Sequence, residues 1–199
     1  MADYWRLEEL ENIARGAILR YDPHFFKYGV QAVPIEQIAE NYGLAIDFMR
    51  LSYNGDLLGR MIFDDGVIEY YNTEADRYRL IDVTAGTMMI DSSLLDRPQS
   101  NGRLRFTIAH ELAHWVLHKR IFKGTEAMAA YQKSDKRSKN RVEFQANYLG
   151  SAFLMPAPTL KLAYNKSRSE KGDVIAKLAK AFEVSKEAMR IRIKELGLN

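Results

Sequence analysis

The chain of 199 residues contains no cysteine, which excludes a disulfide scaffold and a thiolate metal site. It has no apolar run near the roughly 20 residues that a membrane-spanning helix needs, so we expect no membrane partner. Residues 1–9 lack a basic segment followed by an apolar one, which predicts that there is no signal peptide. What remains is typical of a globular protein, with 47% hydrophobic and 28% charged residues. The length suits one domain with or without a small appendage.

The net charge of +3 is unevenly spread along the chain. Acidic residues outnumber basic ones in residues 1–118, whereas residues 119–141 and 161–199 are basic. Such basic segments are either solvated surface or a patch for an acidic partner or nucleic acid. Charge alone does not separate these alternatives.

Apolar residues recur at helical spacing in several segments. Helices are expected at residues 3–20, 34–42, 103–118 and 141–155, and as a helix, turn and helix within 172–198, capped by Asp173 and Ser185 and ended by Gly197. Strands are expected at 44–51, 57–63, 67–71 and 87–91. Asp64-Asp65-Gly66 suggests a hairpin turn between the second and third strands. Residues 72–85 are a loop or an extra strand, and 119–140 are expected to form a long surface loop with room for a short helix at 126–131.

This order of elements predicts an α+β fold, in which a small antiparallel sheet packs on helices. We expect a main domain at residues 1–160. Residues 161–199 are expected to form a helix-turn-helix-like appendage that packs on it.

The most informative segment is the expected helix that contains His110-Glu111-x-x-His114 between apolar residues. Two histidines four positions apart on a helix lie about 40° apart around its axis and about 6 Å apart along it, so both rings can reach one ion. Zinc accepts such nitrogen ligands, and Glu111 on the adjoining edge could take a proton from a water that zinc activates. The pattern therefore predicts a hydrolase with one zinc ion, most simply a peptidase.

A catalytic zinc needs a third protein ligand and an open position for water. His118 is rotated by about 80° from His110 on an ideal helix, so we interpret it as a histidine favoured by the helix C-terminus. His24 lies in an aromatic segment and is interpreted as structural. The downstream carboxylates that could complete the site are Glu126, Asp135 and Glu143.

Glu143 begins the next expected helix, and the residues that share its face are small. Ala146, Asn147 and Gly150 follow at i+3, i+4 and i+7, so this helix could approach the motif helix closely. Asn147 could orient a histidine ligand by a hydrogen bond. The alternatives are a surface role for Glu143 and a purely structural zinc, although the latter leaves Glu111 without a role.

These segments resemble the ImmA/IrrE family of zinc metallopeptidases. The similarity covers most of residues 5–197 and is carried by residues 34–44, by 105–118, by Glu143-x-x-Ala146-Asn147-x-x-Gly150 up to Leu154-Met155-Pro156, and by the pattern from Ile175 to Ser185. Residues 64–86 and 119–140 look longer than is usual in the family. The identity of the substrate is therefore not carried over.

The resemblance implies His110, His114 and Glu143 as zinc ligands and Glu111 as the catalytic base. It further implies a cytoplasmic endopeptidase that cleaves a helix-turn-helix repressor and so derepresses phage, mobile-element or stress genes. The substrate could lie extended along an edge strand, as peptides do on other sheets. Two tyrosines are candidate oxyanion donors by their position alone, Tyr131 and Tyr148. A core or surface role is the simpler interpretation for each.

The alternative is a non-proteolytic module that contains zinc and binds a repressor or DNA, as in a toxin–antitoxin-type operon. Direct binding to nucleic acid is not our preferred expectation, because the apolar residues within 172–198 equally suit a packed helical pair. The basic residues of that segment that could face phosphates are Lys186, Arg190, Arg192 and Lys194.

Overall fold

The computed structural model describes residues 5–96, 101–124, 132–133, 135–169 and 172–198. Its helices are α1 (Leu7–Tyr21), α2 (Ile35–Asn41), α3 (Asn101–Phe122), α5 (Lys136–Leu154), α6 (Ala157–Arg168), α7 (Val174–Ala181) and α8 (Lys186–Glu195). Its strands are β1 (Ala45–Met49), β2 (Gly59–Met61), β3 (Gly66–Asn72), β4 (Arg77–Val83) and β5 (Thr87–Asp91). The fold is therefore α+β, as the sequence predicts. None of the described helices combines the length and hydropathy that crossing a lipid bilayer requires.

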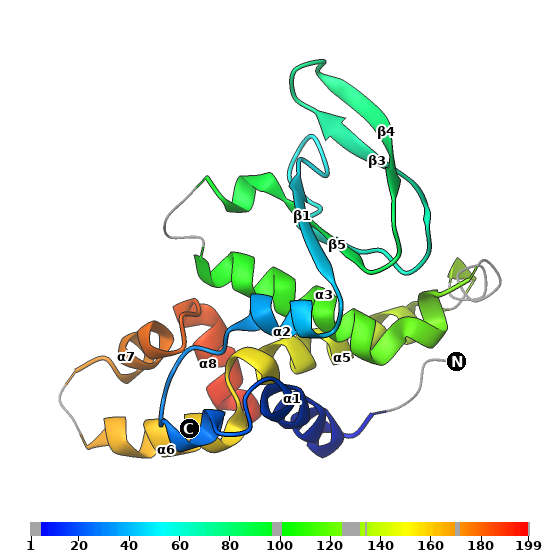
Figure 1. Cartoon of the computed structure of the whole chain (residues 1–199). Coiled ribbons are helices and arrows are strands. Elements are labelled where there is room, and N and C mark those ends of the chain that lie inside the picture. The colour runs from blue at the N-terminus through cyan, green and yellow to red at the C-terminus, as the bar shows by residue number, and fades with distance from the viewer. Residues whose placement is uncertain (1–4, 97–100, 125–131, 134, 170–171, 199) are drawn as a thin grey trace.

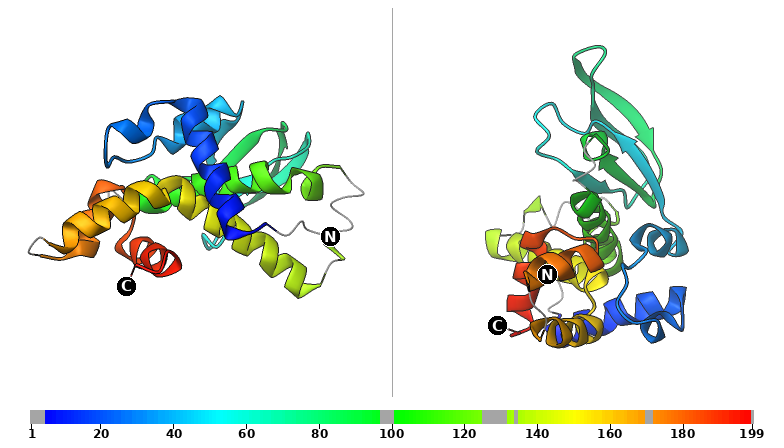
Figure 2. Two further views of the ribbon diagram at one scale, coloured as in Figure 1. Left: turned by 90° about the horizontal axis from the view of Figure 1, so that it is seen from below. Right: turned by 90° about the vertical axis from the view of Figure 1, so that its left-hand side faces the viewer.

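Helix α3 lies between the strands and most of the other helices (Figure 1). The strands occupy one side of α3, and α1, α5 and α6 lie on the opposite side, as the second view of Figure 2 also shows. The main hydrophobic core runs through both layers, since it includes Leu10 from α1, Met88 from β5 and Leu112 from α3. The helix that carries the histidine motif is thus held on both sides.

The three-stranded sheet has the order β1-β5-β2. β1 runs parallel to β5, whereas β2 runs antiparallel to it, so the prediction of an antiparallel sheet is wrong for the first pair. Parallel neighbours need a long crossover connection. Here residues 50–86 supply it, and they contain β2, β3 and β4.

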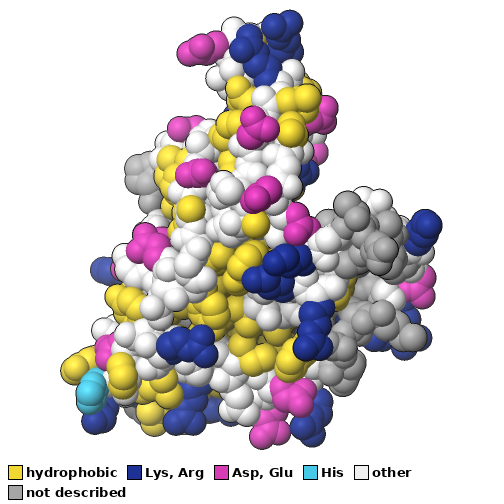
Figure 3. Space-filling model, turned by 45° about the vertical axis from the view of Figure 1, so that its right-hand side comes forward, with side chains coloured by type: hydrophobic (Ala, Val, Ile, Leu, Met, Phe, Trp, Pro, Cys, Tyr) yellow, Lys and Arg dark blue, Asp and Glu magenta, His cyan; other side chains and the backbone are white. Residues whose placement is uncertain are grey.

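The predicted hairpin around Asp64-Asp65-Gly66 is also wrong, because β2 pairs with β5 and not with β3. β3 pairs with β4 instead, which resolves the ambiguous residues 72–85 in favour of a strand. The turn lies at the far end, where the Asn72 side chain accepts a hydrogen bond from the Ala75 amide and Asp76 has a φ of 49°. This β3–β4 hairpin stands out from the helical body and carries basic and hydrophobic side chains (Figure 3).

The close approach of α5 to α3 occurs where the sequence predicts it. A Cβ atom built on Gly150 would lie 3.2 Å from the backbone nitrogen of His110, so only glycine fits without some displacement. Ala146 on α5 and Ala109 and Ala113 on α3 are fully buried. The small residues therefore bring the carboxyl side chain of α5 within reach of the two histidines.

Two segment boundaries differ from the prediction. α3 continues to Phe122 and α5 begins at Lys136, so helix replaces both ends of the loop expected at 119–140. The short helix suggested at 126–131 lies outside the described residues. α6 has no counterpart among the predicted helices. α5 ends at Leu154, and Pro156 two residues later is the N-cap of α6.

The C-terminal helices begin where their caps predict. The Asp173 side chain accepts a hydrogen bond from the Ala176 amide at the start of α7, and the Ser185 hydroxyl accepts one from Ala188 at the start of α8. Arg192 is fully buried, so the suggestion that it faces phosphates is wrong. A division of the chain at residue 160, with a helix-turn-helix-like appendage after it, stays a prediction.

Candidate metal centre

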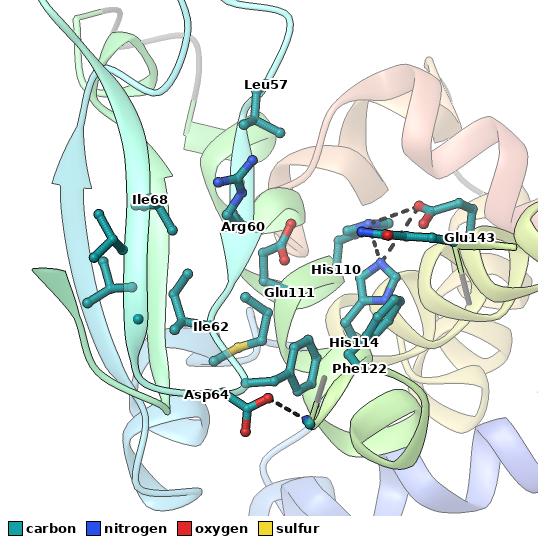
Figure 4. Close-up of a pocket in the computed structure, with 18 residues that line it drawn as sticks. Leu57, Arg60, Ile62, Asp64, Ile68, His110, Glu111, His114, Phe122 and Glu143 are labelled. Atoms are coloured by element: carbon teal, nitrogen blue, oxygen red, sulfur yellow. Dashed lines mark hydrogen bonds and ion pairs between the residues drawn. The ribbon is translucent and has the colours of Figure 1, made fainter. Parts of the chain in front are cut away.

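The two motif histidines and Glu143 meet at one point between α3 and α5 (Figure 4). Nε2 of His110 lies 3.0 Å from Nε2 of His114. The Glu143 carboxylate lies 3.5 Å from the first of these nitrogens and 3.7 Å from the second. The histidines come from successive turns of α3, and the glutamate comes from the first half of α5.

The charge balance of this cluster favours a cation. Hydrogen bonds from His110 and His114 hold the pKa of the Glu143 carboxyl well below its usual range, despite partial burial. Burial lowers the pKa of His110, but the neighbouring carboxylates Glu143 and Glu111 raise it overall. Groups that together attract a proton so strongly can exchange it for a metal ion, because metal binding releases protons from its ligands.

The distances fit zinc. In a tetrahedral site with bonds of about 2.0–2.1 Å, two ligand atoms lie about 3.3 Å apart. The three edges of the cluster are 3.0, 3.5 and 3.7 Å, so one ion could contact all three atoms with small side-chain adjustments. His110, His114 and Glu143 could therefore supply three ligand atoms to one metal ion, and three protein ligands is the number found in catalytic zinc sites.

Glu111 lies beside this cluster but is not one of the three grouped residues. Its side chain is 7% exposed and lies beneath strand β2, where a Cβ atom built on Gly59 would be only 2.7 Å from its Oε1. Burial raises the pKa of the Glu111 carboxyl, although a hydrogen bond from the Met61 backbone opposes the shift. A buried carboxyl with a raised pKa next to a cation site suits a group that accepts and returns a proton.

The remaining ring nitrogens of both histidines contact further side chains. Nδ1 of His110 lies 3.0 Å from Oδ1 of Asn147, the contact that the sequence suggested. Nδ1 of His114 lies 3.1 Å from Nδ1 of His118, and Nε2 of His118 lies 3.1 Å from Oε1 of Gln145. Gln145 was not among the predicted site residues, because its contact with His118 joins two helices and no local pattern of either helix indicates it.

The interpretation of His118 as a histidine favoured by the helix C-terminus is wrong. The residue is 1% exposed, and α3 continues beyond it to Phe122. Burial lowers its pKa to about 4, so the ring is neutral near neutral pH. The His118 ring lies on the same side of α3 as His114, since their Nδ1 atoms are 3.1 Å apart.

The other candidates lie away from the cluster or outside the described residues. Exposed His24 precedes a short 3-10 helix (Phe25–Lys27), and Asp135 caps α5 by accepting a hydrogen bond from the Ser138 amide. The Tyr148 hydroxyl donates to Glu11 on α1, which makes it a core residue and no oxyanion donor. The candidates outside the described residues are Glu126 and Tyr131.

A trough of about 1000 Å³ opens beside the cluster. One wall is β2, which is an edge strand of its sheet, and the base of the β3–β4 hairpin forms another. Figure 4 shows Ile62, Ile68 and Leu57 on the side opposite the histidines. The lining is mainly apolar, and the charged Arg60 and Asp64 also belong to it.

Comparison with protein families matches residues 70–194 to a peptidase family described as the IrrE N-terminal-like domain. A solved Mycobacterium tuberculosis transcriptional regulator has a similar fold, with a TM-score of 0.55 and 16% sequence identity over 93% of this chain. Only 55% of that protein is spanned, and at this identity the likeness shows the fold alone. The search of curated proteins found no match. Because the family match extends over more than half of its length, the chain belongs to the ImmA/IrrE family.

Proposed function

We propose that the protein is a zinc-dependent endopeptidase, with His110, His114 and Glu143 as ligands and Glu111 as the base. The observation that carries this proposal is the meeting of the three ligand atoms within 4.8 Å of one another. It is supported by the buried Glu111 carboxyl next to them and by membership of a peptidase family. A purely structural ion would leave this costly buried carboxyl unexplained.

Bound zinc would activate a water molecule and polarise the scissile carbonyl. Glu111 would accept a proton from the attacking water and return it to the leaving amine. The raised pKa of Glu111 favours the first of these two steps, because a carboxylate with a higher pKa is a stronger base. Asn147 accepts a hydrogen bond from Nδ1 of His110, which leaves Nε2 free to face the ion.

The trough fits an extended peptide. Among the strands that the structure describes, β2 pairs only with β5, so its outer edge can pair with a substrate strand. A substrate placed there would pass the cluster near Gly59, where a built Cβ atom lies 2.7 Å from Oε1 of Glu111. The apolar wall formed by Ile62, Ile68 and Val83 then favours a bulky apolar side chain beside the scissile bond.

We further propose that the substrate is a helix-turn-helix repressor and that cleavage occurs in the cytoplasm, where repressors act. Family membership and the regulator-like fold of the Mycobacterium tuberculosis protein support a regulatory role. Direct binding to DNA is less favoured, because Lys186 and Arg190 on α8 already pair with Asp173 and Glu187. A docking module without proteolysis is the alternative that the experiment must separate.

The test is to incubate the purified, zinc-loaded protein with the repressor encoded beside it and to follow the products by mass spectrometry. We expect cleavage by the wild type and by Glu187→Gln, an exposed control, and none by Glu111→Gln. Cleavage that survives Glu111→Gln would rule out the proposed base. Stable binding without cleavage by any variant would favour the docking module.

The ligand set has its own test, which is the zinc content of the purified protein. Glu143→Ala removes one of the three ligand atoms, so we expect zinc affinity to fall while the fold persists. Glu143 has a half-exposed side chain, and its loss leaves no large cavity. An unchanged stoichiometry and affinity would show that the third ligand lies elsewhere.

A further inference from the structure

The histidine ligands are supported in different ways at their outer nitrogens. His110 contacts a side-chain amide directly, whereas His114 contacts a second histidine, which in turn contacts an amide. All three members of the second chain are buried, with exposures of 7% for His114, 1% for His118 and 2% for Gln145. Buried polar groups in such a chain must agree on the direction of every hydrogen bond.

The direction follows from the last member. The Oε1 atom of Gln145 can only accept, so Nε2 of His118 carries a hydrogen and donates it. A neutral imidazole carries a single hydrogen, so a His118 ring that donates from Nε2 accepts at Nδ1, which lies 3.1 Å from Nδ1 of His114. The hydrogen between the two Nδ1 atoms therefore belongs to His114, which leaves its Nε2 with a free lone pair.

The free lone pair of His114 lies on the nitrogen that faces the proposed metal position. Nε2 of His114 is the atom that lies 3.0 Å from Nε2 of His110 and 3.7 Å from the Glu143 carboxylate. If the Gln145 amide were reversed, every hydrogen in the chain would shift. Nε2 of His114 would then carry a hydrogen and could not bind a metal.

We propose that His118 and Gln145 are positioning residues of the metal centre, which together fix His114 in the Nδ1–H tautomer through a two-step hydrogen-bond relay. The inference rests on the proposed metal site but not on peptidase activity. Carboxylates are common partners of metal-bound histidines and raise the basicity of the ligand. A neutral relay orients the ring without adding a negative charge, so the ion would keep more of its positive charge for the reaction.

The first test is NMR of the protein labelled with ¹⁵N at its histidines, of which there are only four. Two-bond ring correlations identify which nitrogen carries the hydrogen. We expect the Nδ1–H form for His114 and the Nε2–H form for His118, both before and after zinc is added. The opposite pair of tautomers in the zinc-loaded protein would overturn the proposal.

The second test is zinc affinity, measured by competition with a chromophoric chelator. His118→Leu removes the acceptor, so we expect roughly 10–100-fold weaker binding. His118→Asn places an amide oxygen near the lost Nδ1 and should restore affinity to within about threefold of the wild type. A relay that is merely structural would lower the melting temperature of both variants and leave their zinc affinities alike.

Gln145→Met provides a matched change that leaves both histidines in place. It removes the distal acceptor at nearly constant size, so we expect a mixture of His114 tautomers and a smaller loss of zinc affinity. This variant decides the matter if His118→Leu does not fold. Wild-type affinity and a single His114 tautomer in Gln145→Met would refute the relay, whereas the predicted tautomers without any cleavage would refute only the peptidase proposal.

Discussion

Strand β2 crosses the proposed catalytic base at Gly59, and Gly59→Ala adds one methyl group at this crossing. The new Cβ atom would lie 2.7 Å from Oε1 of Glu111 and 2.7 Å from Cγ2 of Thr107, whereas ordinary contacts begin at 3.4 Å. The difference, 3.4 less 2.7, means a displacement of about 0.7 Å. The backbone of Gly59 is not in the left-handed region, so alanine brings no strain of its own.

The end of a flexible glutamate side chain moves more easily than the backbone of a strand. We therefore expect Glu111 to give way, with a loss of unfolding free energy near the lower end of the roughly 1–3 kcal/mol that overpacking costs. Misplacement of a catalytic group by about 1 Å can cost about 100-fold in rate, so kcat should fall about 10–100-fold. Zinc affinity should stay the same, because the three ligand atoms are not among the nearest neighbours of the added methyl group.

The assay is steady-state cleavage of a quenched fluorescent peptide, whose sequence is that of the site identified by mass spectrometry in the proposed repressor substrate, together with zinc content and thermal unfolding. Gly66→Ala is the matched control, since Gly66 also lines the trough but a Cβ atom there meets nothing within 4 Å. We expect near wild-type kcat for the control. Equal activities of both variants would refute the argument that the placement of Glu111 sets the rate.

Three further changes test the surrounding structure. Gly150→Ala should press α5 away from His110, where its Cβ would be 3.2 Å from the backbone nitrogen, and weaken zinc binding about tenfold in the chelator assay. Asp91→Asn should lower the unfolding free energy by about 2–3 kcal/mol in urea titrations, because charged hydrogen bonds are lost in a fully buried site. Burial raises the pKa of Asp91 but its hydrogen bonds lower it overall, so this stabilisation is present above about pH 4 and disappears as the pH falls through the lower folded value. Arg192→Met should cost about 3–5 kcal/mol, since it removes the buried cation that pairs with Glu11 and leaves that carboxylate only its hydrogen bond from Tyr148 among the contacts of the described residues.

Each of these has an outcome that contradicts it. Zinc affinity unchanged in Gly150→Ala would mean that the helix spacing does not position the ligands. An acid stability profile of Asp91→Asn that parallels the wild type would mean that this carboxylate is not the linked group. For the third change, Arg190→Met is the control, because its pair with Glu187 is exposed and should contribute less than about 1 kcal/mol.

Local sequence patterns predicted most helices well, because amphipathic spacing and caps act within a few residues. Asp173 and Ser185 cap α7 and α8 as their side chains suggest. The strand pairing was predicted less well, because the turn signal at Asp64-Asp65-Gly66 is equally compatible with other contacts. Asp64 accepts a hydrogen bond from the Gly124 backbone, which is distant in sequence, and no local rule foresees that contact.

The grouping of His110, His114 and Glu143 was predictable because two of its three members lie on one helix. The spacing of His110 and His114 places both rings on one face of α3. The small residues around Gly150 predict that α5 packs closely there and brings Glu143 near them. The pairing of His118 with Gln145 depends on the rotation of two helices about their axes. That rotation results from packing of the whole core, so the burial of His118 could not be predicted from its position in the motif.

The central claim is that one zinc ion binds His110, His114 and Glu143, with Glu111 beside it and not bound to it. The most direct measurement is an anomalous difference map at the zinc absorption edge from crystals of the zinc-loaded protein. The account predicts a single peak about 2.0–2.2 Å from both Nε2 atoms and from a Glu143 oxygen. A peak bound by Glu111 in place of Glu143, or no peak between α3 and α5, would contradict it.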